Sequence, residues 1–481
     1  MTDRRTGWPY QVFEQMASTL ARRLSGYVRD SAAGAGPVVR IRPVSEIAAD
    51  LDLGRWIRDG GMTPEAFDSF ADTYCANSTR LHHPAYLAHQ VAVPDFPSAL
   101  ADLMNGVMNN GMAIYEMGPA AVAVELAVLD WMLGQVGWLP VAGGDDGRVA
   151  TGGAGVLTHG GSLANLTALL AARASAAPRA WEAGVPGDLG ILVPPASHYS
   201  IARAASILGL GSEAMVPLAV DTRDVIRPDA LPQALRRLTA AGRRPMALVA
   251  NACATATGLF DPLDEIASFC AEAGIWMHVD GAHGATALLS PCQRERLRGV
   301  ARADSMVWDA HKMLRTSALC AAVLFRDARA FEATFREKAS YLFYGEPGQG
   351  VDLIHRTVEC TKLPLGLKLF FNLAWRGERG LGEYWDDRLA AARRFAAIIA
   401  DRPGFSCPFE PEANIVCFRH GTDDDHQIAV REALLASGRF HLSSAEIGGR
   451  RYLRLVVMSP ATNDETIGEL LDAIEALERT H

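Results

Sequence analysis

The chain has 481 residues, of which 49% are hydrophobic and 21% charged, and its net charge is −9. This composition is typical of a globular protein of two or three structural units and excludes a globally disordered chain. The negative net charge argues against a nucleic-acid partner. No apolar run approaches the roughly 20 residues of a membrane helix. The start of the chain has no secretory signal pattern, and the eight cysteines are scattered. We therefore expect a cytoplasmic protein with no membrane or nucleic-acid partner.

The first 80 residues predict a helical segment. Apolar residues recur at helical spacing over 11–27, and Thr63-Pro64 marks a helix start, with threonine as the N-cap and proline in the first turn. Further helices are expected at 99–111 and 120–136. The second of these is apolar nearly all round, so we expect it to be buried.

From about residue 150 short apolar strands alternate with helices, which is typical of a mostly parallel sheet covered on both faces. The expected strands are 155–158, 190–193, 246–250, 275–279, 305–308 and 319–325. The expected helices between them are 164–174, 201–208 and 262–273.

The rest of the chain predicts a loop and then a small α+β unit. The stretch 337–356 contains glycines and a proline, and long loops of this kind are often functional. Helices are expected at 363–375, 384–402, 426–437 and 464–479, and strands at 414–418 and 452–458. The expected organisation is a helical N-terminal segment, a large α/β domain and a small C-terminal domain, with bounds 1–80, 81–380 and 381–481.

Four polar clusters follow predicted strands, at the edge where open α/β sheets bind ligands. The clusters are Gly160-Gly161-Ser162, His198, Asp280 with His283, and His311-Lys312. The two glycines before a helix form a cradle for an anion such as a phosphate, although a plain turn with a serine cap has the same pattern.

Lys312 is the candidate nucleophile. Only four of the 46 basic residues are lysines, and arginine cannot form an imine. The apolar neighbours of Lys312 predict burial, which lowers the pKa of an amine and makes it a better nucleophile. Asp280 could pair with a cationic ring nitrogen or act as a helix cap. His198 could stack on an aromatic ring or be a hydrogen-bonded core histidine.

An alternative hypothesis from a different enzyme class is a metal-dependent hydrolase, in which His278, Asp280 and His283 bind the metal. Their spacing, His-x-Asp-x-x-His, matches no strong metal signature. We therefore expect no metal and keep the metallohydrolase as an outside alternative.

The run His278-Val279-Asp280-Gly281-Ala282-His283, followed by Asp309-Ala310-His311-Lys312-Met313, resembles the group II pyridoxal-phosphate-dependent amino acid decarboxylases. The resemblance covers about residues 50–475 and includes His83-Pro84-Ala85-Tyr86 and the stretch 119–131. It implies the fold-type I, aspartate-aminotransferase-like architecture. It also implies a homodimer with shared active sites, in which the N-terminal segment wraps the partner.

The resemblance also implies roles at matching positions. Lys312 would hold pyridoxal 5'-phosphate (PLP) as an internal aldimine, Asp280 would pair with the pyridine nitrogen, and His198 would stack on the ring. Ala282 would pack on the other face of the ring. The remaining cofactor contacts would come from Gly160, Gly161, Ser162, Thr255 and His311.

Three departures from the family pattern concern the substrate and the phosphate. The loop tyrosine that usually returns a proton to Cα is missing from its place, which leaves Tyr344 and His355 as candidate donors. Lys362 stands where relatives often have an arginine near the substrate carboxylate, and His83 is a second candidate substrate-binding residue. Asp309 replaces a common asparagine beside the phosphate, and we expect it to point away because it would repel that group.

We therefore expect a PLP-dependent decarboxylase that converts an L-amino acid to the amine and carbon dioxide through a quinonoid intermediate. The resemblance places it nearest the glutamate and diaminobutyrate branches. The alternative within PLP chemistry is a decarboxylative oxidative deaminase that yields an aldehyde, because relatives without the loop tyrosine can be oxidative.

Overall fold

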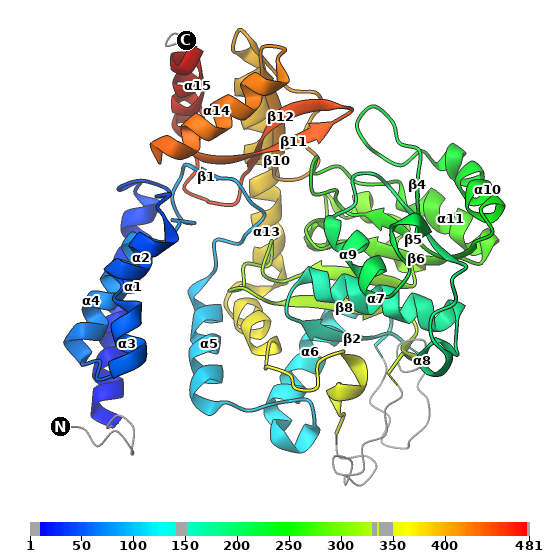
Figure 1. Cartoon of the computed structure of the whole chain (residues 1–481), viewed down its shortest axis with the longest axis horizontal. Helices are drawn as coiled ribbons and strands as arrows, with labels where there is room; N and C mark the ends of the chain where they lie inside the picture. The colour runs from blue at the N-terminus through cyan, green and yellow to red at the C-terminus, as the bar shows by residue number, and fades with distance from the viewer. Residues whose placement is uncertain (1–9, 141–151, 330–333, 336–349, 479–481) are drawn as a thin grey trace.

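The computed structural model describes residues 10–140, 152–329, 334–335 and 350–478. Figure 1 shows the N-terminal helices on one side, a large sheet with its helices on the other, and a small sheet near the C-terminus. The long helix α13 (Gly366–Asp401) runs between the two sheets.

The N-terminal segment is helical, as predicted. The side chain of Thr63 accepts a hydrogen bond from the Ala66 N–H at 3.2 Å, which confirms the predicted N-cap. The next helix begins three residues earlier than predicted, because Asp95 precedes a proline in its first turn. The helices of this half are α1 (Tyr10–Ala32), α2 (Val44–Asp50), α3 (Leu53–Asp59), α4 (Pro64–Ala76), α5 (Phe96–Met108) and α6 (Pro119–Val136).

Helix α6 is long and apolar enough, by length and composition, to cross a membrane. The sequence-based expectation that no run approaches that length therefore needs correction. The criterion is weak, because core helices meet it too, and α6 packs against β2 and α13 with Glu125 and Met132 fully buried.

The large sheet is mostly parallel, which confirms the prediction. Its order is β2-β8-β7-β6-β5-β3-β4, and β8 alone runs against its neighbours. The strands are β2 (Ala154–Thr158), β3 (Leu189–Val193), β4 (Met215–Pro217), β5 (Arg244–Asn251), β6 (Trp276–Asp280), β7 (Ser305–Asp309) and β8 (Ala321–Phe325).

Both faces of this sheet are covered, because alternate residues of each apolar strand point into different cores. Ala247 and Val249 of β5 pack with α7 and α9, whereas Leu248 and Ala250 pack on the side of α6 and α11. The helices of this domain are α7 (Gly161–Ala176), α8 (Ala180–Ala183), α9 (Tyr199–Ile207), α10 (Leu231–Ala240) and α11 (Leu263–Ala273).

The two helices predicted at 363–375 and 384–402 form one kinked helix, α13. The kink lies at Gly377, whose φ of 65° and ψ of 169° break the helical geometry. A positive φ is accessible to glycine because it has no Cβ. The domain boundary predicted at residue 380 falls just after this kink.

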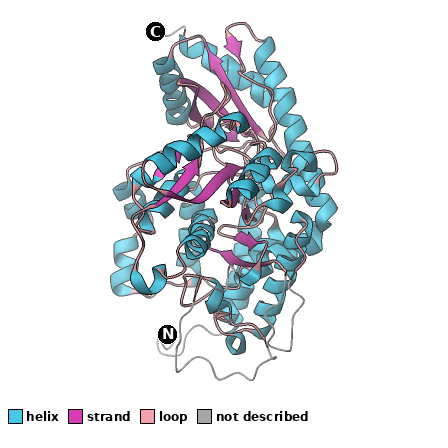
Figure 2. Ribbon diagram, turned by 90° about the vertical axis from the view of Figure 1, so that its right-hand side faces the viewer, coloured by secondary structure: helices cyan, strands magenta, loops and turns pink. Residues whose placement is uncertain are grey.

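The small sheet has the order β1-β11-β12-β10-β9 and lies apart from the large one (Figure 2). The sequence did not predict β11, although Gly448-Gly449 is a typical two-residue hairpin turn and both glycines have positive φ. The elements are β1 (Tyr86–Leu87), β9 (Phe405–Ser406), β10 (Ile415–His420), α14 (Asp424–Ser437), β11 (His441–Ile447), β12 (Arg450–Val456) and α15 (Asp464–Glu478).

Candidate active site

A cavity of about 280 Å³ lies where β2, β6 and β7 end and α7 begins. Every cofactor residue that the family resemblance implies lines it. These residues are Gly160, Gly161, Ser162, His198, Thr255, Asp280, Ala282, His311 and Lys312. The structure therefore brings the predicted cluster together, as expected from strands whose carboxyl ends share one edge.

A larger cavity of about 1000 Å³ adjoins the first. His198, Thr255 and Lys312 line both cavities, so the Lys312 side chain lies where the two meet. The outer wall comes from β11 and β12 of the small sheet, including Ser443 and Arg454. The arrangement gives a small polar chamber, where the predicted cofactor residues lie, and a wider one, which we call the substrate chamber after the prediction, with the amine between them.

The first turn of α7 forms the anion cradle. Gly160, with a φ of 98°, caps the helix, and Gly161 is its first residue. A Cβ on Gly161 would lie 2.8 Å from both carboxylate oxygens of Asp309, so glycine is required there by close approach. Backbone N–H groups at such a helix start favour a phosphate.

Asp309 does not point away from this cradle, so the sequence-based expectation is wrong. Its Oδ2 lies 3.3 Å from Lys312 Nζ and 3.7 Å from His311 Nε2. Its Oδ1 is buried and has no hydrogen-bond partner among the described residues. The reason is local, because Asp309 ends β7 and the turn that follows brings Lys312 back over the carboxylate.

Asp280 is the last residue of β6 and is largely buried. Its Oδ2 accepts a hydrogen bond from Asn165 Nδ2 at 3.0 Å, and its Oδ1 accepts one from the Ala282 N–H at 3.2 Å. Each oxygen of this buried carboxylate therefore has a hydrogen-bond donor. The geometry suits the predicted partner, a protonated ring nitrogen.

His198 caps α9, and its Nδ1 lies 2.7 Å from Ser200 Oγ. Burial lowers the pKa of this histidine, with smaller opposing effects from nearby charges that include Asp280. Burial thus favours the uncharged ring, which suits a side chain that covers the face of an aromatic ring.

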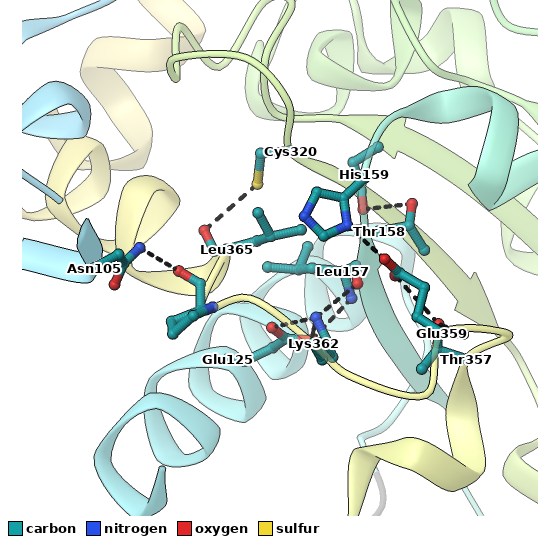
Figure 3. Close-up of polar contacts among 12 residues, drawn as sticks. Asn105, Glu125, Leu157, Thr158, His159, Cys320, Thr357, Glu359, Lys362 and Leu365 are labelled. Carbon is teal, nitrogen blue, oxygen red and sulfur yellow. Dashed lines mark hydrogen bonds and ion pairs between the residues drawn. The ribbon is translucent and has the colours of Figure 1, made fainter. Parts of the chain in front are cut away.

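Lys362 is the clearest correction to the substrate-binding residues. Its side chain is 0% exposed, and its Nζ lies 2.9 Å from each carboxylate oxygen of Glu125, which is equally buried. The ammonium also donates to the Leu157 carbonyl at 2.8 Å, while Glu125 accepts from the Leu157 N–H (Figure 3). Lys362 therefore joins α6 to β2 and lines neither cavity, so the prediction that it contacts substrate is wrong for this structure.

The other predicted substrate and loop residues also lie outside the two cavities or outside the described residues. His83 is buried beside β1, where its Nδ1 accepts from the Ala85 N–H at 3.0 Å, so it does not reach the substrate chamber. His355 lies in the short 3-10 helix Leu353–Arg356, which lines neither cavity. Tyr344 falls outside the described residues, so its proton-donor role stays a prediction.

The metallohydrolase alternative finds no support in the described part of the chain. Both ring nitrogens of His278 are used, one with Ser305 Oγ and one with Asn165 Oδ1, each at 2.9 Å. The described residues contain no cluster of histidine, cysteine or carboxylate side chains that could hold a metal ion.

Sequence reasoning missed two residues of the site, Asn165 and Arg454. Asn165 follows the glycine cradle at a helical spacing that turns it inward, a pattern that is visible in the sequence but not specific. Arg454 stands in the otherwise apolar run Leu453-Arg454-Leu455-Val456. An arginine inside the apolar part of a predicted strand was an available signal.

Comparisons with known proteins agree with this geometry. Residues 67–421 match the family described as "Pyridoxal-dependent decarboxylase conserved domain". The chain is 31% identical over 459 residues to the acidic amino acid decarboxylase GADL1 of Bos taurus, covering 91% of this chain and 85% of that protein. It is 31% identical over 403 residues to the L-2,4-diaminobutyrate decarboxylase of Rhizobium meliloti, covering 82% of this chain and 77% of that protein.

The fold is also that of a solved relative. The crystal structure of mouse CSAD superimposes with a TM-score of 0.85 at 26% identity, covering 96% of this chain and 98% of that chain. This likeness, with the family match, confirms the expected fold-type I architecture.

The substitution Asp309→Asn should tighten PLP binding about tenfold. A carboxylate beside the phosphate cradle repels the phosphate, by roughly 4 kcal/mol for two unit charges 4 Å apart in a partly screened site. Lys312 and His311 face the same carboxylate and offset most of this repulsion, so we expect about 1.4 kcal/mol, a factor of ten, to remain. The dissociation constant follows from an absorbance titration of the apoprotein. Pyridoxal, which lacks the phosphate, serves as the control ligand, and the substitution should increase its affinity much less. Weaker PLP binding in the variant would mean that Asp309 stabilises the bound phosphate.

The substitution Lys362→Met should destabilise the protein by about 3–5 kcal/mol, because it leaves the buried Glu125 carboxylate without its partner. Burial already raises the pKa of Glu125, and Lys362 opposes that rise. The measurement is the urea midpoint of the holoenzyme. The double variant Glu125→Leu/Lys362→Met should recover most of the stability that Lys362→Met loses, because no carboxylate is then left unpaired. A raised KM with an unchanged midpoint would instead restore Lys362 as a substrate contact.

Proposed function

The chain belongs to the pyridoxal-dependent decarboxylases, and we propose that its substrate is an L-amino acid with an acidic side chain. The family and the named relatives make it a PLP-dependent amino acid carboxy-lyase, which confirms the main sequence-based prediction. The side-chain class is the open question, and it depends on the larger cavity.

The smaller cavity fits PLP by its chemistry. It offers a glycine cradle for the phosphate, a hydrogen-bonded carboxylate for the ring nitrogen, and an amine for the aldehyde. One buried polar atom of its lining, His283 Nδ1, has no protein partner among the described residues. When bound, PLP supplies a conjugated ring that accepts the electron pair left behind as carbon dioxide departs.

Each of these residues then has a definable task. Asp280 holds a proton at the ring nitrogen, which keeps the ring a good electron acceptor. His198 covers one face of the ring as a neutral imidazole. The Lys312 amine, at the junction of the two cavities, is placed to exchange with the amine of an incoming substrate.

The observation that carries the acidic-substrate proposal is Arg454. Its guanidinium is buried, lines the larger cavity and has no carboxylate within ion-pair distance among the described residues. All its hydrogen bonds go to neutral oxygens, those of Ala88, Thr255, Ala256 and Ser443. A guanidinium has five N–H donors, so one of its Nη2 hydrogens is left for an anionic ligand.

Two acidic residues line the same cavity, Asp224 and Glu446, and neither forms an ion pair with Arg454 among the described residues. Glu446 is 3.2 Å from Arg451, which neutralises it locally. The relative named as an acidic amino acid decarboxylase supports an anionic substrate. The relative named for 2,4-diaminobutyrate acts on a cationic side chain, so that substrate is the direct competitor in any test.

We also propose that the protein acts as a homodimer in the cytoplasm. Helix α5 exposes an apolar stripe at helical spacing, formed by Phe96, Leu100, Leu103, Met104, Val107 and Met108. Figure 1 shows α5 between the N-terminal helices and the body of the protein. Such a stripe on a globular protein supports a contact with a second copy.

A panel of amino acids should show at least tenfold higher kcat/KM for acidic side chains than for their amides and for L-2,4-diaminobutyrate. Carbon dioxide release is the assay, and oxygen uptake is recorded in parallel. Uptake matching the carbon dioxide would establish the oxidative deaminase instead. A preference for diaminobutyrate would overturn the acidic-substrate proposal and leave the decarboxylase intact.

The substitution Arg454→Met should lower kcat/KM for the acidic substrate by about 100-fold, because a charge-assisted hydrogen bond contributes roughly 1.5–3 kcal/mol. Arg454→Lys keeps the positive charge but loses the paired N–H donors of the guanidinium, so its kcat/KM should fall by a smaller factor. The exposed Arg450→Met on the same strand is the matched control and should stay within twofold. Melting temperature and PLP absorbance establish that each variant is folded and loaded.

The substitution Val107→Glu should convert the dimer into a soluble monomer with little activity. A buried charge without a partner opposes association across an apolar contact. Light scattering after size exclusion gives the mass. Gln233→Glu places the same charge on the exposed face of α10 and should leave the dimer unchanged. A wild-type monomer would overturn the dimer proposal.

A further inference from the structure

Asn165 lines the cofactor cavity and makes hydrogen bonds to three groups around it. Its Nδ2 lies 3.0 Å from Asp280 Oδ2 and 2.9 Å from Ser200 Oγ, and its Oδ1 lies 2.9 Å from His278 Nε2. The side chain is buried in the first turns of α7. These bonds are therefore shielded from solvent, and losing one leaves a buried polar group unsatisfied.

The orientation of the Asn165 amide follows from its neighbours. A carboxylate only accepts hydrogen bonds, so the NH₂ group must face Asp280 and the carbonyl must face His278. His278 therefore carries its proton on Nε2. Its Nδ1 accepts from Ser305 Oγ at 2.9 Å, and that hydroxyl in turn accepts from Trp276 Nε1 at 2.9 Å.

The second hydrogen of the amide fixes His198. Ser200 Oγ accepts from Asn165 and directs its own proton to His198 Nδ1 at 2.7 Å. The Ser200 N–H also points to that nitrogen at 3.3 Å. With Nδ1 an acceptor of both, the remaining proton of the neutral ring stands on Nε2.

We propose that Asn165 is a positioning residue that couples the two groups facing the cofactor ring. It holds the Asp280 carboxylate in place for the ring nitrogen and, through Ser200, fixes His198 as the Nε2–H tautomer. His278, Ser305 and Trp276 anchor the amide from behind, and every donor in this chain has one acceptor. The inference rests on the cofactor role of the site and not on the substrate class proposed above.

This coupling has a mechanical consequence. Asp280 ends a strand and His198 begins a helix, so two different elements would otherwise set their orientations independently. One amide that bonds to Asp280 directly and to His198 through Ser200 sets a common geometry before the cofactor binds. Such preorganisation lowers the cost of binding the ring.

The first test measures PLP affinity and the tautomer of His198 in Asn165→Leu, which keeps the approximate volume and removes the donors. We expect PLP to bind 10- to 100-fold more weakly, because Asp280 loses a charge-assisted hydrogen bond. Nitrogen-15 NMR of the imidazoles, with His198→Gln to assign the signal, should show a loss of the pure Nε2–H form.

Two further variants separate positioning from packing. In His278→Gln an amide N–H can replace the lost donor, so PLP affinity should stay within threefold of wild type. His278→Leu has no such donor and should bind PLP about tenfold more weakly. Thr167→Val is the matched control on α7, since its hydroxyl bonds only to Leu163 O within the helix. It should bind PLP within twofold of wild type.

Two results would overturn the proposal. One is an Asn165→Leu protein with wild-type PLP affinity and an unchanged His198 tautomer. The other is an equal loss in Thr167→Val, which would assign the effect to packing of α7.

If Asn165→Leu does not fold, Ser200→Ala decides the question, since it removes the hydroxyl that links Asn165 to His198 and leaves the bond from Asn165 to Asp280. The backbone N–H of residue 200 remains as a weaker donor to His198 Nδ1 at 3.3 Å, so we expect PLP binding within threefold of wild type and a mixture of the two tautomers; an unchanged tautomer would overturn the coupling. If the wild-type protein and all variants fail to bind PLP, the result contradicts the cofactor role of the site and not the coupling through Asn165.

Discussion

The buried carboxylate of Asp280 is the group on which the rest of the site depends. A charge in this position is costly unless donors and a cation satisfy it, and two donors come from Asn165 and the Ala282 N–H. The strand register then fixes what surrounds it. Asp280 pairs with Asn251 of β5 and Val307 of β7, so β7 extends two residues further to Asp309 and turns to bring in Lys312. Parallel strands thus place a carboxylate and an amine side by side at one sheet edge.

Cofactor chemistry and substrate recognition lie on different parts of the chain. The smaller cavity is built by the large sheet, whereas the outer wall of the larger one comes from β11, β12 and the residues after β1. Arg454 connects these parts, since its guanidinium donates to the carbonyls of Ala88, Thr255 and Ala256. A residue that joins its own strand to two other segments also sets the distance between them. A ligand on its free N–H would therefore act where the small sheet meets the large one.

Local patterns were enough to predict the sheet, most helices and the cofactor cluster, because strand ends follow directly from apolar runs and glycines. Contacts between distant segments were not accessible in this way. Lys362 and Asn165 each depend on a partner more than 100 residues away, Glu125 in one case and Asp280 in the other. Asp309 was misjudged because its position follows from a turn, not from the charge of the expected ligand. The hairpin of β11 and β12 was missed, and with it the placement of Arg454.

The contrast between Lys312 and Lys362 shows why residue type alone does not identify a nucleophile. Both ammonium groups lie near a carboxylate, 3.3 Å from Asp309 and 2.9 Å from Glu125 respectively. Lys362 is enclosed, bonded to both oxygens of its partner and to a backbone carbonyl, so any reaction would first leave a charge buried and alone. Lys312 keeps 17% of its side chain exposed at the junction of two cavities, and its carboxylate partner also contacts His311. Its ion pair is therefore the weaker and more accessible one. Of these two lysines, only Lys312 can exchange its ion pair for a new covalent bond without leaving a fully buried carboxylate alone.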